Sequence, residues 1–414
     1  MARPRSSLAS AAGVPGTLIA GSVFAVAMAA FSRIPLLPEI GQDLHLTVTE
    51  IGLLTTSFGV GRLLMDLPAG RLSAAVPAAA ALAAAGATLA VSCALLAVSG
   101  SMLEALFASS LIGCATALTN TTGMYAFATA TGAERRGTSM AIFTTALMSG
   151  QMVGPAVGGA LGALSGWRAA VGVAAGVGVA VALACLSRLR ASRCAPVASP
   201  RASAGGGRGG EGERHPVPPR RELIALAATP FATFFGVAGL IQTLIPVIGN
   251  DELELSSSTI GFALGVGAAA RFLSAWVAGV GSDRLSRKAV LVPSLLLMAL
   301  GAGVLALSPS VVAWMAAIVL LATGSSGISV AAAALADRVS ERRLGHELGL
   351  FRLLGDFGLL IGPVVAGFLY QRSGQGLAGA ASAAVLVTAA GAVALLVREP
   401  EPGSMRPGGD VALE

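Results

Sequence analysis

Among the ionisable side chains in the long apolar runs of this chain, six are candidates for function, four arginines and two aspartates. They are Arg33, Arg62, Asp66, Arg271, Arg352 and Asp356. A charged side chain at the centre of a bilayer costs about 2.5–3.5 kcal/mol even on the mildest scale, so such residues are functional candidates. We expect these six to gate a pathway, to couple it to protons or to bind a solute.

Arg62 and Asp66 are four residues apart, as are Arg352 and Asp356, so each pair shares one helix face. One interpretation is that each pair stabilises its own helix. The other is that the four charges meet across two helices and form an inner gate, with Asp66 or Asp356 as the proton carrier. For Arg33, the alternative is a side chain that extends to the membrane surface.

Arg271 has Ala275 where an acidic partner would lie. Four arginines against two aspartates leave the six residues with a net positive charge, which favours an anionic or carboxylate-bearing solute. Other polar side chains in the apolar runs are candidates for hydrogen bonds in a central cavity. They are Thr119, Asn120, Tyr125, Gln151, Gln242, Ser325 and Ser326.

The sequence offers little for metal or covalent chemistry. The three histidines and four cysteines show no metal-ligand spacing, and there is no nucleophile–base constellation and no phosphate-cradling loop. A polytopic membrane enzyme is therefore the weaker hypothesis. We expect no metal and no cofactor, with a proton gradient as the energy source.

The elements that position these residues are predicted to be membrane helices. Hydrophobic residues make up 55% of the 414 residues and charged residues only 12%, whereas soluble domains carry about 25%. The 54 glycines suit close helix packing in lipid. The net charge of +6 does not indicate nucleic acid, because aromatic residues are 5% and the basic residues stand between apolar runs.

A helix of about 20 apolar residues crosses a bilayer, and the chain contains twelve such runs. They cover residues 15–36, 48–70, 76–98, 102–127, 139–164, 168–187, 223–247, 258–280, 289–308, 311–335, 348–370 and 377–397. The pattern predicts an all-α membrane protein with two six-helix bundles, residues 14–187 and 223–397. The first run also resembles a secretory signal, although it is long for one.

The basic residues predict the topology. Most of the 27 lysines and arginines fall in segments on one side, and the loops on the other side are acidic where they are charged. Such an excess marks the cytoplasmic side. We expect a monomeric inner-membrane protein with cytoplasmic tails at 1–13 and 398–414 and a disordered basic linker at 188–222.

The two predicted bundles are copies of one unit. Residues of the first half recur 208 or 209 positions later: Ile51, Gly52, Arg62, Gly154, Pro155 and Gly159 match Ile260, Gly261, Arg271, Gly362, Pro363 and Gly367. Like-oriented halves of this kind are typical of transporters in which one half rocks against the other about a central site.

A loop after the eighth run has the order Gly-x-x-x-Asp-Arg-x-x-Arg-Lys. Its residues are Gly279, Asp283, Arg284, Arg287 and Lys288. It resembles the signature loop of the major facilitator superfamily, which in that family steadies the outward-facing state from the inner side. The resemblance implies that Asp283 caps the start of the fifth helix. The first-half copy has Ala74 and Ala75 in place of Asp-Arg.

The fifth run carries the order Gly-x-x-x-Gly-Pro-x-x-Gly-Gly. Its residues are Gly150, Gly154, Pro155, Gly158 and Gly159. It resembles the antiporter motif of the same superfamily, which is associated with exporters that exchange substrate for protons. Glycines that serve packing alone are the alternative. Ser109 stands where drug/proton antiporters have an arginine, so proton coupling stays open.

Over the chain outside the linker and tails, the resemblance is to the 12-span drug and metabolite efflux branch of the superfamily. It implies a secondary transporter that works by a rocker switch in the lipid bilayer and exports a small organic solute against protons. An uptake symporter or a facilitator of the same fold is the nearest alternative. A transporter-like sensor is a further one.

Overall fold

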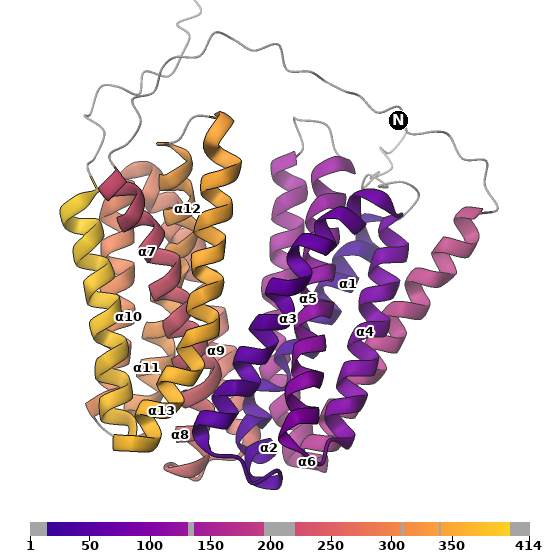
Figure 1. The fold of residues 1–414 in the computed structure, drawn as a ribbon, viewed down its shortest axis with the longest axis horizontal. Coiled ribbons are helices and arrows are strands. Elements are labelled where there is room, and N and C mark those ends of the chain that lie inside the picture. Colours follow the sequence, from indigo (N-terminus) through magenta and orange to yellow (C-terminus); the bar gives the residue numbers. More distant parts are fainter. Residues whose placement is uncertain (1–14, 131–135, 194–219, 308–309, 339–340, 398–414) are drawn as a thin grey trace, which may run out of the picture.

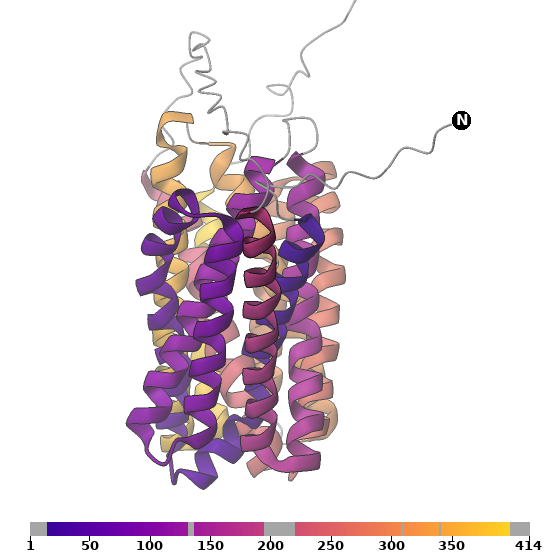
Figure 2. The same ribbon diagram turned by 90° about the vertical axis from the view of Figure 1, so that its right-hand side faces the viewer.

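The computed structural model describes residues 15–130, 136–193, 220–307, 310–338 and 341–397. In this part of the chain every regular element is a helix. The helices run side by side as two groups, one from each half of the sequence (Figures 1 and 2). The predicted tails lie outside the described residues, and so does most of the predicted linker, from residue 194 to 219.

Nine helical stretches among the described residues are long and apolar enough to cross a membrane. Two of them, 52 and 48 residues long, turn back on themselves and each make two crossings. Helix α3 (Val48–Ala75, 28 residues) is long enough as well, and its charged residues lower its hydropathy. The described helices therefore make twelve crossings, as the sequence predicts.

The first half forms six crossings. They are α1 (Gly16–Phe31) continued by η1 (Ile34–Leu36) and α2 (Leu37–Asp43), then α3, α4 (Ala78–Val98), α5 (Met102–Ala130) and the two arms of α6 (Arg136–Arg193). The arms of α6 meet at Gly166, whose φ of 80° suits a glycine.

The second half repeats this order. Its crossings are α7 (Arg220–Gly236) continued by η3 (Val237–Leu244) and α8 (Ile245–Asp251), then α9 (Ser257–Arg284), α10 (Arg287–Leu307), α11 (Val311–Gly324) continued by η4 (Ser325–Gly327) and α12 (Ile328–Ala336), and the two arms of α13 (Glu341–Leu396). The arms of α13 meet at Gly374, with a φ of 69°.

Several crossings extend beyond the apolar runs. The first was expected to end at residue 36, yet α2 continues it to Asp43, because Pro38 lies in the first turn of this short helix, where its missing N–H costs nothing. The sixth was expected to end at 187, yet α6 runs to Arg193. Polar residues outside the lipid can remain helical, so hydropathy alone misses these ends.

The bundle has two chemically different ends. We call the end with α2, α8 and the turns at Gly166 and Gly374 the acidic end, and the end where α3 and α9 finish the basic end. In Figure 1 the two groups of helices meet at the acidic end and stand apart at the basic end. Each group has its own hydrophobic core, and Ile34 and Val247 each pack into the core of the other half.

Near the acidic end the halves are joined at two places where helices from opposite halves cross at a glycine, and we call these the glycine crossings. A Cβ atom on Gly52 of α3 would collide with the carbonyl oxygen of Pro363 on α13, and one on Gly261 of α9 would collide with that of Pro155 on α6. These four residues are the matched positions of the sequence repeat. The repeat is therefore placed where the two halves touch.

Polar contacts reinforce the same end. The Gln42 amide donates to Asn250 Oδ1 at 2.7 Å, between residues that are 208 positions apart. The Thr56 hydroxyl donates to the Leu360 carbonyl at 2.7 Å, again across the halves. Together with the glycine crossings, these contacts close the acidic end in this conformation.

Candidate functional site

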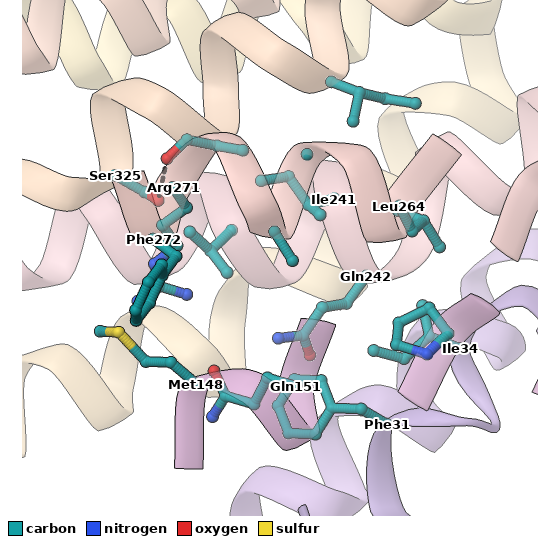
Figure 3. A pocket seen from close by; sticks show the side chains of 16 residues that line it. Phe31, Ile34, Met148, Gln151, Ile241, Gln242, Leu264, Arg271, Phe272 and Ser325 are labelled. Atoms are coloured by element: carbon teal, nitrogen blue, oxygen red, sulfur yellow. Dashed lines mark hydrogen bonds between the residues drawn. The ribbon is translucent and has the colours of Figure 1, made fainter. Parts of the chain in front are cut away.

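A cavity lies between the two halves, on the basic side of the glycine crossings (Figure 3). The space in it that is open to the centre of a water molecule is about 70 Å³. α6 contributes Met148 and Gln151, and α9 contributes Arg271 and Phe272, while Phe31 at the end of α1 closes another side. The lining is mostly apolar, with a few polar groups from both halves.

Gln151 and Gln242 come from opposite halves, and their amides face the same space in Figure 3. Gln242 lies in η3, an eight-residue π-helix. Such helices are rare and are frequent at functional sites, because the wider turn redirects side chains. In the described part of the chain neither amide has a hydrogen-bond partner, so both are available to a solute.

Arg271 lines the cavity beside Phe272 and Met148. Its guanidinium forms no hydrogen bond or ion pair with any residue that the structure describes. Ser325, also on the lining, donates its hydroxyl to the Ala322 carbonyl at 2.7 Å. Asn120 and Tyr125, expected as cavity residues, do not line it.

Four charged side chains come together between α3 and α13. They are Arg62, Asp66, Arg352 and Asp356. The guanidinium of Arg352 contacts both carboxylate oxygens of Asp66 at 3.4 Å, across the two halves. Among the described residues, neither within-helix pair lies within ion-pair distance. Arg62 and Asp356 are each within electrostatic range of the other three charges. Cross-pairing is therefore the geometry observed.

The pair between Asp66 and Arg352 lies on the basic side of the Gly52 contact between α3 and α13. Asp66 lies about 21 Å further along α3 than Gly52, at 1.5 Å per residue. The pair between Asp66 and Arg352 is already formed in this conformation, in which the acidic end is closed. Its formation therefore does not require the acidic end to be open. The Asp356 carboxylate is half-buried and has no ion-pair partner among the described residues.

Arg33 is buried, with 4% of its surface exposed, so it does not extend to the membrane surface. Its guanidinium lies 4.7 Å from the ring centre of Phe58. Its Nε and Nη1 groups are buried without a hydrogen-bond partner in the described structure. Arg33 does not line the cavity.

The antiporter-like motif packs two helices. Gly150 and Gly154 face α1, and Gly158 faces Ser32 directly after it, so closely that a Cβ atom on any of them would collide with the backbone there. Gly159 faces Ser257 of α9 in the same way. Pro155 of the same motif contacts Gly261 of α9. The motif therefore joins the fifth membrane-spanning helix both to the first one and to the second half.

The signature-like loop lies at the basic end. Arg287 donates to Asp337 at 3.0 Å and to the Ser282 hydroxyl at 2.7 Å, and Lys288 donates to the Val397 carbonyl at 3.1 Å. Gly279 has open space around it and Arg284 is exposed. The side chain of Asp283 lies outside the described part, so its predicted cap remains a prediction.

Sequence reasoning missed the apolar side of the cavity. Phe31, Met148 and Phe272 are common residue types in membrane helices, and nothing in the sequence distinguishes them from residues that face lipid. The π-helix also went unpredicted, because its residues would suit an α-helix equally well.

Comparisons with known proteins agree with this architecture. The chain matches the Major Facilitator Superfamily over residues 19–279 and 226–412. It is 31% identical to the tetracycline resistance protein, class C, of Escherichia coli over 150 residues, which are 36% of this chain and 37% of that protein. The match thus spans little more than a third of the length of that relative.

Two solved structures share the fold. One is a bacterial homolog of the human lysosomal transporter Spinster in an inward-facing and occupied conformation, with a TM-score of 0.72, 14% identity, and coverage of 92% of this chain and 96% of that one. The other is the nucleoside transporter NupG, with a TM-score of 0.69, 14% identity, and coverage of 93% and 99%. The chain belongs to the Major Facilitator Superfamily and is a multi-pass secondary transporter.

Proposed function

We propose that the chain is a proton-coupled exporter of a small organic solute, working by alternating access between two six-helix halves. The basic end, the linker and both termini would face the cytoplasm of a cell with this protein in its inner membrane. The observation that carries the proposal is the cavity between the halves, closed at the acidic end by paired glycine crossings.

Three features support export against protons. The glycines Gly150, Gly154 and Gly158 pack α6 against α1, as an antiporter-like motif would. The local likeness to a tetracycline resistance protein points the same way. Carboxylates next to arginines lie between the halves, where protonation can change the contacts that join them.

Asp356 is the proposed proton carrier. Asp66 is engaged by Arg352, whereas Asp356 is half-buried with no ion-pair partner among the described residues. Protonating Asp356 removes a negative charge near Arg62 and Arg352. The repulsion between these two arginines is then offset by one negative charge fewer. This favours separation of α3, which carries Arg62, from α13, which carries Arg352.

The test is transport in vesicles with a defined pH gradient. Purified protein is reconstituted, and a panel of drugs and metabolites is screened for movement opposite to the protons. Accumulation against the proton flow supports export by antiport. Accumulation along the proton flow identifies a symporter, and transport that ignores the gradient identifies a facilitator; either result overturns proton antiport.

Asp356→Asn separates coupling from transport. An amide cannot carry the proton, so gradient-driven accumulation should disappear while exchange of labelled for unlabelled solute continues. The matched variant is Glu254→Gln, at an exposed carboxylate of the acidic end, which should keep both activities. Loss of exchange as well would assign Asp356 to solute binding or to the fold.

A further inference from the structure

The cavity has an uncompensated positive charge. Arg271 is the charged residue among the side chains that line it, and α1, α6, α11, η3 and η4 present no carboxylate to the lining. Within the described residues its guanidinium has no ion-pair or hydrogen-bond partner. Arg271 is half-buried and lies within a membrane helix, where an unpaired charge is costly, so we expect its partner to be a ligand.

The sequence repeat provides a contrast at the equivalent position. Arg62 in the first half has Asp66 one helical turn further on, and lies within electrostatic range of Asp356. Arg271 has Ala275 in place of that aspartate. The positive charge of Arg62 therefore has negative charges near it within the protein. The positive charge of Arg271 faces the cavity without such neighbours among the described residues.

The surroundings of Arg271 describe the rest of the ligand. The amides of Gln151 and Gln242 provide hydrogen bonds from opposite halves, while Phe31, Phe272 and Met148 offer apolar surface (Figure 3). A guanidinium presents a planar pair of donors that matches a carboxylate. A ligand with one anionic group on an apolar body would satisfy each of these groups.

We propose that the cavity binds an amphipathic organic monoanion, with its carboxylate on Arg271 and its apolar body between Phe272 and Phe31. This inference rests on the proposed function, in which the cavity is the substrate site. Lipophilic cations are disfavoured, because the cavity would place them next to Arg271 with no carboxylate to bind them.

The test compares ligands of one shape and different charge. Purified protein in lipid nanodiscs is titrated with a panel of aryl and alkyl monocarboxylates, each with its uncharged amide and its amine analogue, and the unfolding midpoint is followed. At least one carboxylate should raise the midpoint and bind about tenfold or more tightly than its amide. A panel in which no carboxylate outperforms its amide overturns the inference.

Variants at Arg271 locate the effect. Arg271→Gln should remove the preference for the carboxylate, and Arg271→Lys should keep part of it, since the charge remains without the planar fork. The control Arg372→Gln changes an exposed arginine that lies over Phe368, away from the cavity, and should retain the preference. If Arg271→Gln retains it too, the anion binds elsewhere.

This experiment and the transport test fail independently. Binding is measured at equilibrium without a gradient, so a carboxylate that binds through Arg271 but moves without protons overturns only the proposed coupling. A cationic solute that is exchanged for protons overturns only the proposed anion site.

Discussion

Three arginines within the membrane helices are the most unusual single residues of this protein, and each has different neighbours. Arg62 lies among other charges, Arg271 faces a cavity, and Arg33 stacks on Phe58 with two buried N–H groups unpaired in the described structure. The three positions were visible in the sequence as charges in apolar runs. Their different neighbours depend on helix packing, which the sequence does not reveal.

Arg33→Met tests whether the buried guanidinium contributes to stability. Methionine has a similar length and no polar group to leave unpaired, so the unfolding midpoint should stay the same or rise. The measurement is thermal unfolding of the purified variant. A midpoint several degrees lower would show that the contact with Phe58 outweighs the cost of the unpaired groups.

The interhalf pair between Asp66 and Arg352 allows a charge swap. Each single change, Asp66→Arg or Arg352→Asp, places like charges together and should reduce transport. The double variant restores the pair and should recover part of the rate. Since the Arg352 side chain is half exposed, we expect the pair itself to contribute only about 0–1 kcal/mol.

The within-helix swap is the control for this pair. If Arg352→Asp is rescued by Asp356→Arg and not by Asp66→Arg, the charges act within α13 and no gate connects α3 to α13. Transport rates of all variants are compared at equal protein levels in the membrane.

At the scale of elements, the glycine crossings decide how closely the halves approach. Gly52 and Gly261 contact carbonyl oxygens of the opposite half, and Gly159 and Gly367 do so one or two turns away along the same interfaces. Without a Cβ atom, these helices approach at backbone distance. The crossings therefore explain why the repeat preserves glycine and proline where other residues have diverged.

Gly52→Ala and Gly261→Ala should each weaken closure of the acidic end. The added methyl group meets a carbonyl oxygen, and overpacking of this kind costs about 1–3 kcal/mol. Transport should fall and the unfolding midpoint should drop. Gly172→Ala is the matched control, because a Cβ there meets nothing within 4 Å and alanine favours a helix by about 0.8–1.0 kcal/mol.

The number of crossings and the repeat could be predicted from the sequence, because each crossing needs about 20 apolar residues and the offset of 208 or 209 pairs them. The partner of Asp66 could not. Local spacing offered Arg62, four residues away, whereas the structure pairs it with Arg352, 286 residues away. Such a contact depends on how α3 and α13 cross, and no local pattern encodes that.

At the scale of the whole molecule, exchange of an anionic solute for a proton would move net charge across the membrane. If a proton enters as an organic monoanion leaves, both movements carry positive charge inward. A membrane potential that is negative inside should therefore accelerate export, by about 2.3 kcal/mol of driving force per charge for each 100 mV. Vesicles with imposed potassium diffusion potentials measure this. A rate independent of potential would contradict anion–proton exchange.

The alternation of the two ends is the claim on which the mechanism depends, and distances between spin labels test it most directly. One label pair, at Ser165 and Glu254, spans the halves at the acidic end, and another, at Arg71 and Leu350, spans them toward the basic end; all four positions are exposed. A carboxylate ligand together with a rise in pH, which removes the proton from Asp356, should lengthen the first distance while shortening the second. Distances that stay fixed, or that change together in the same direction, would contradict alternating access.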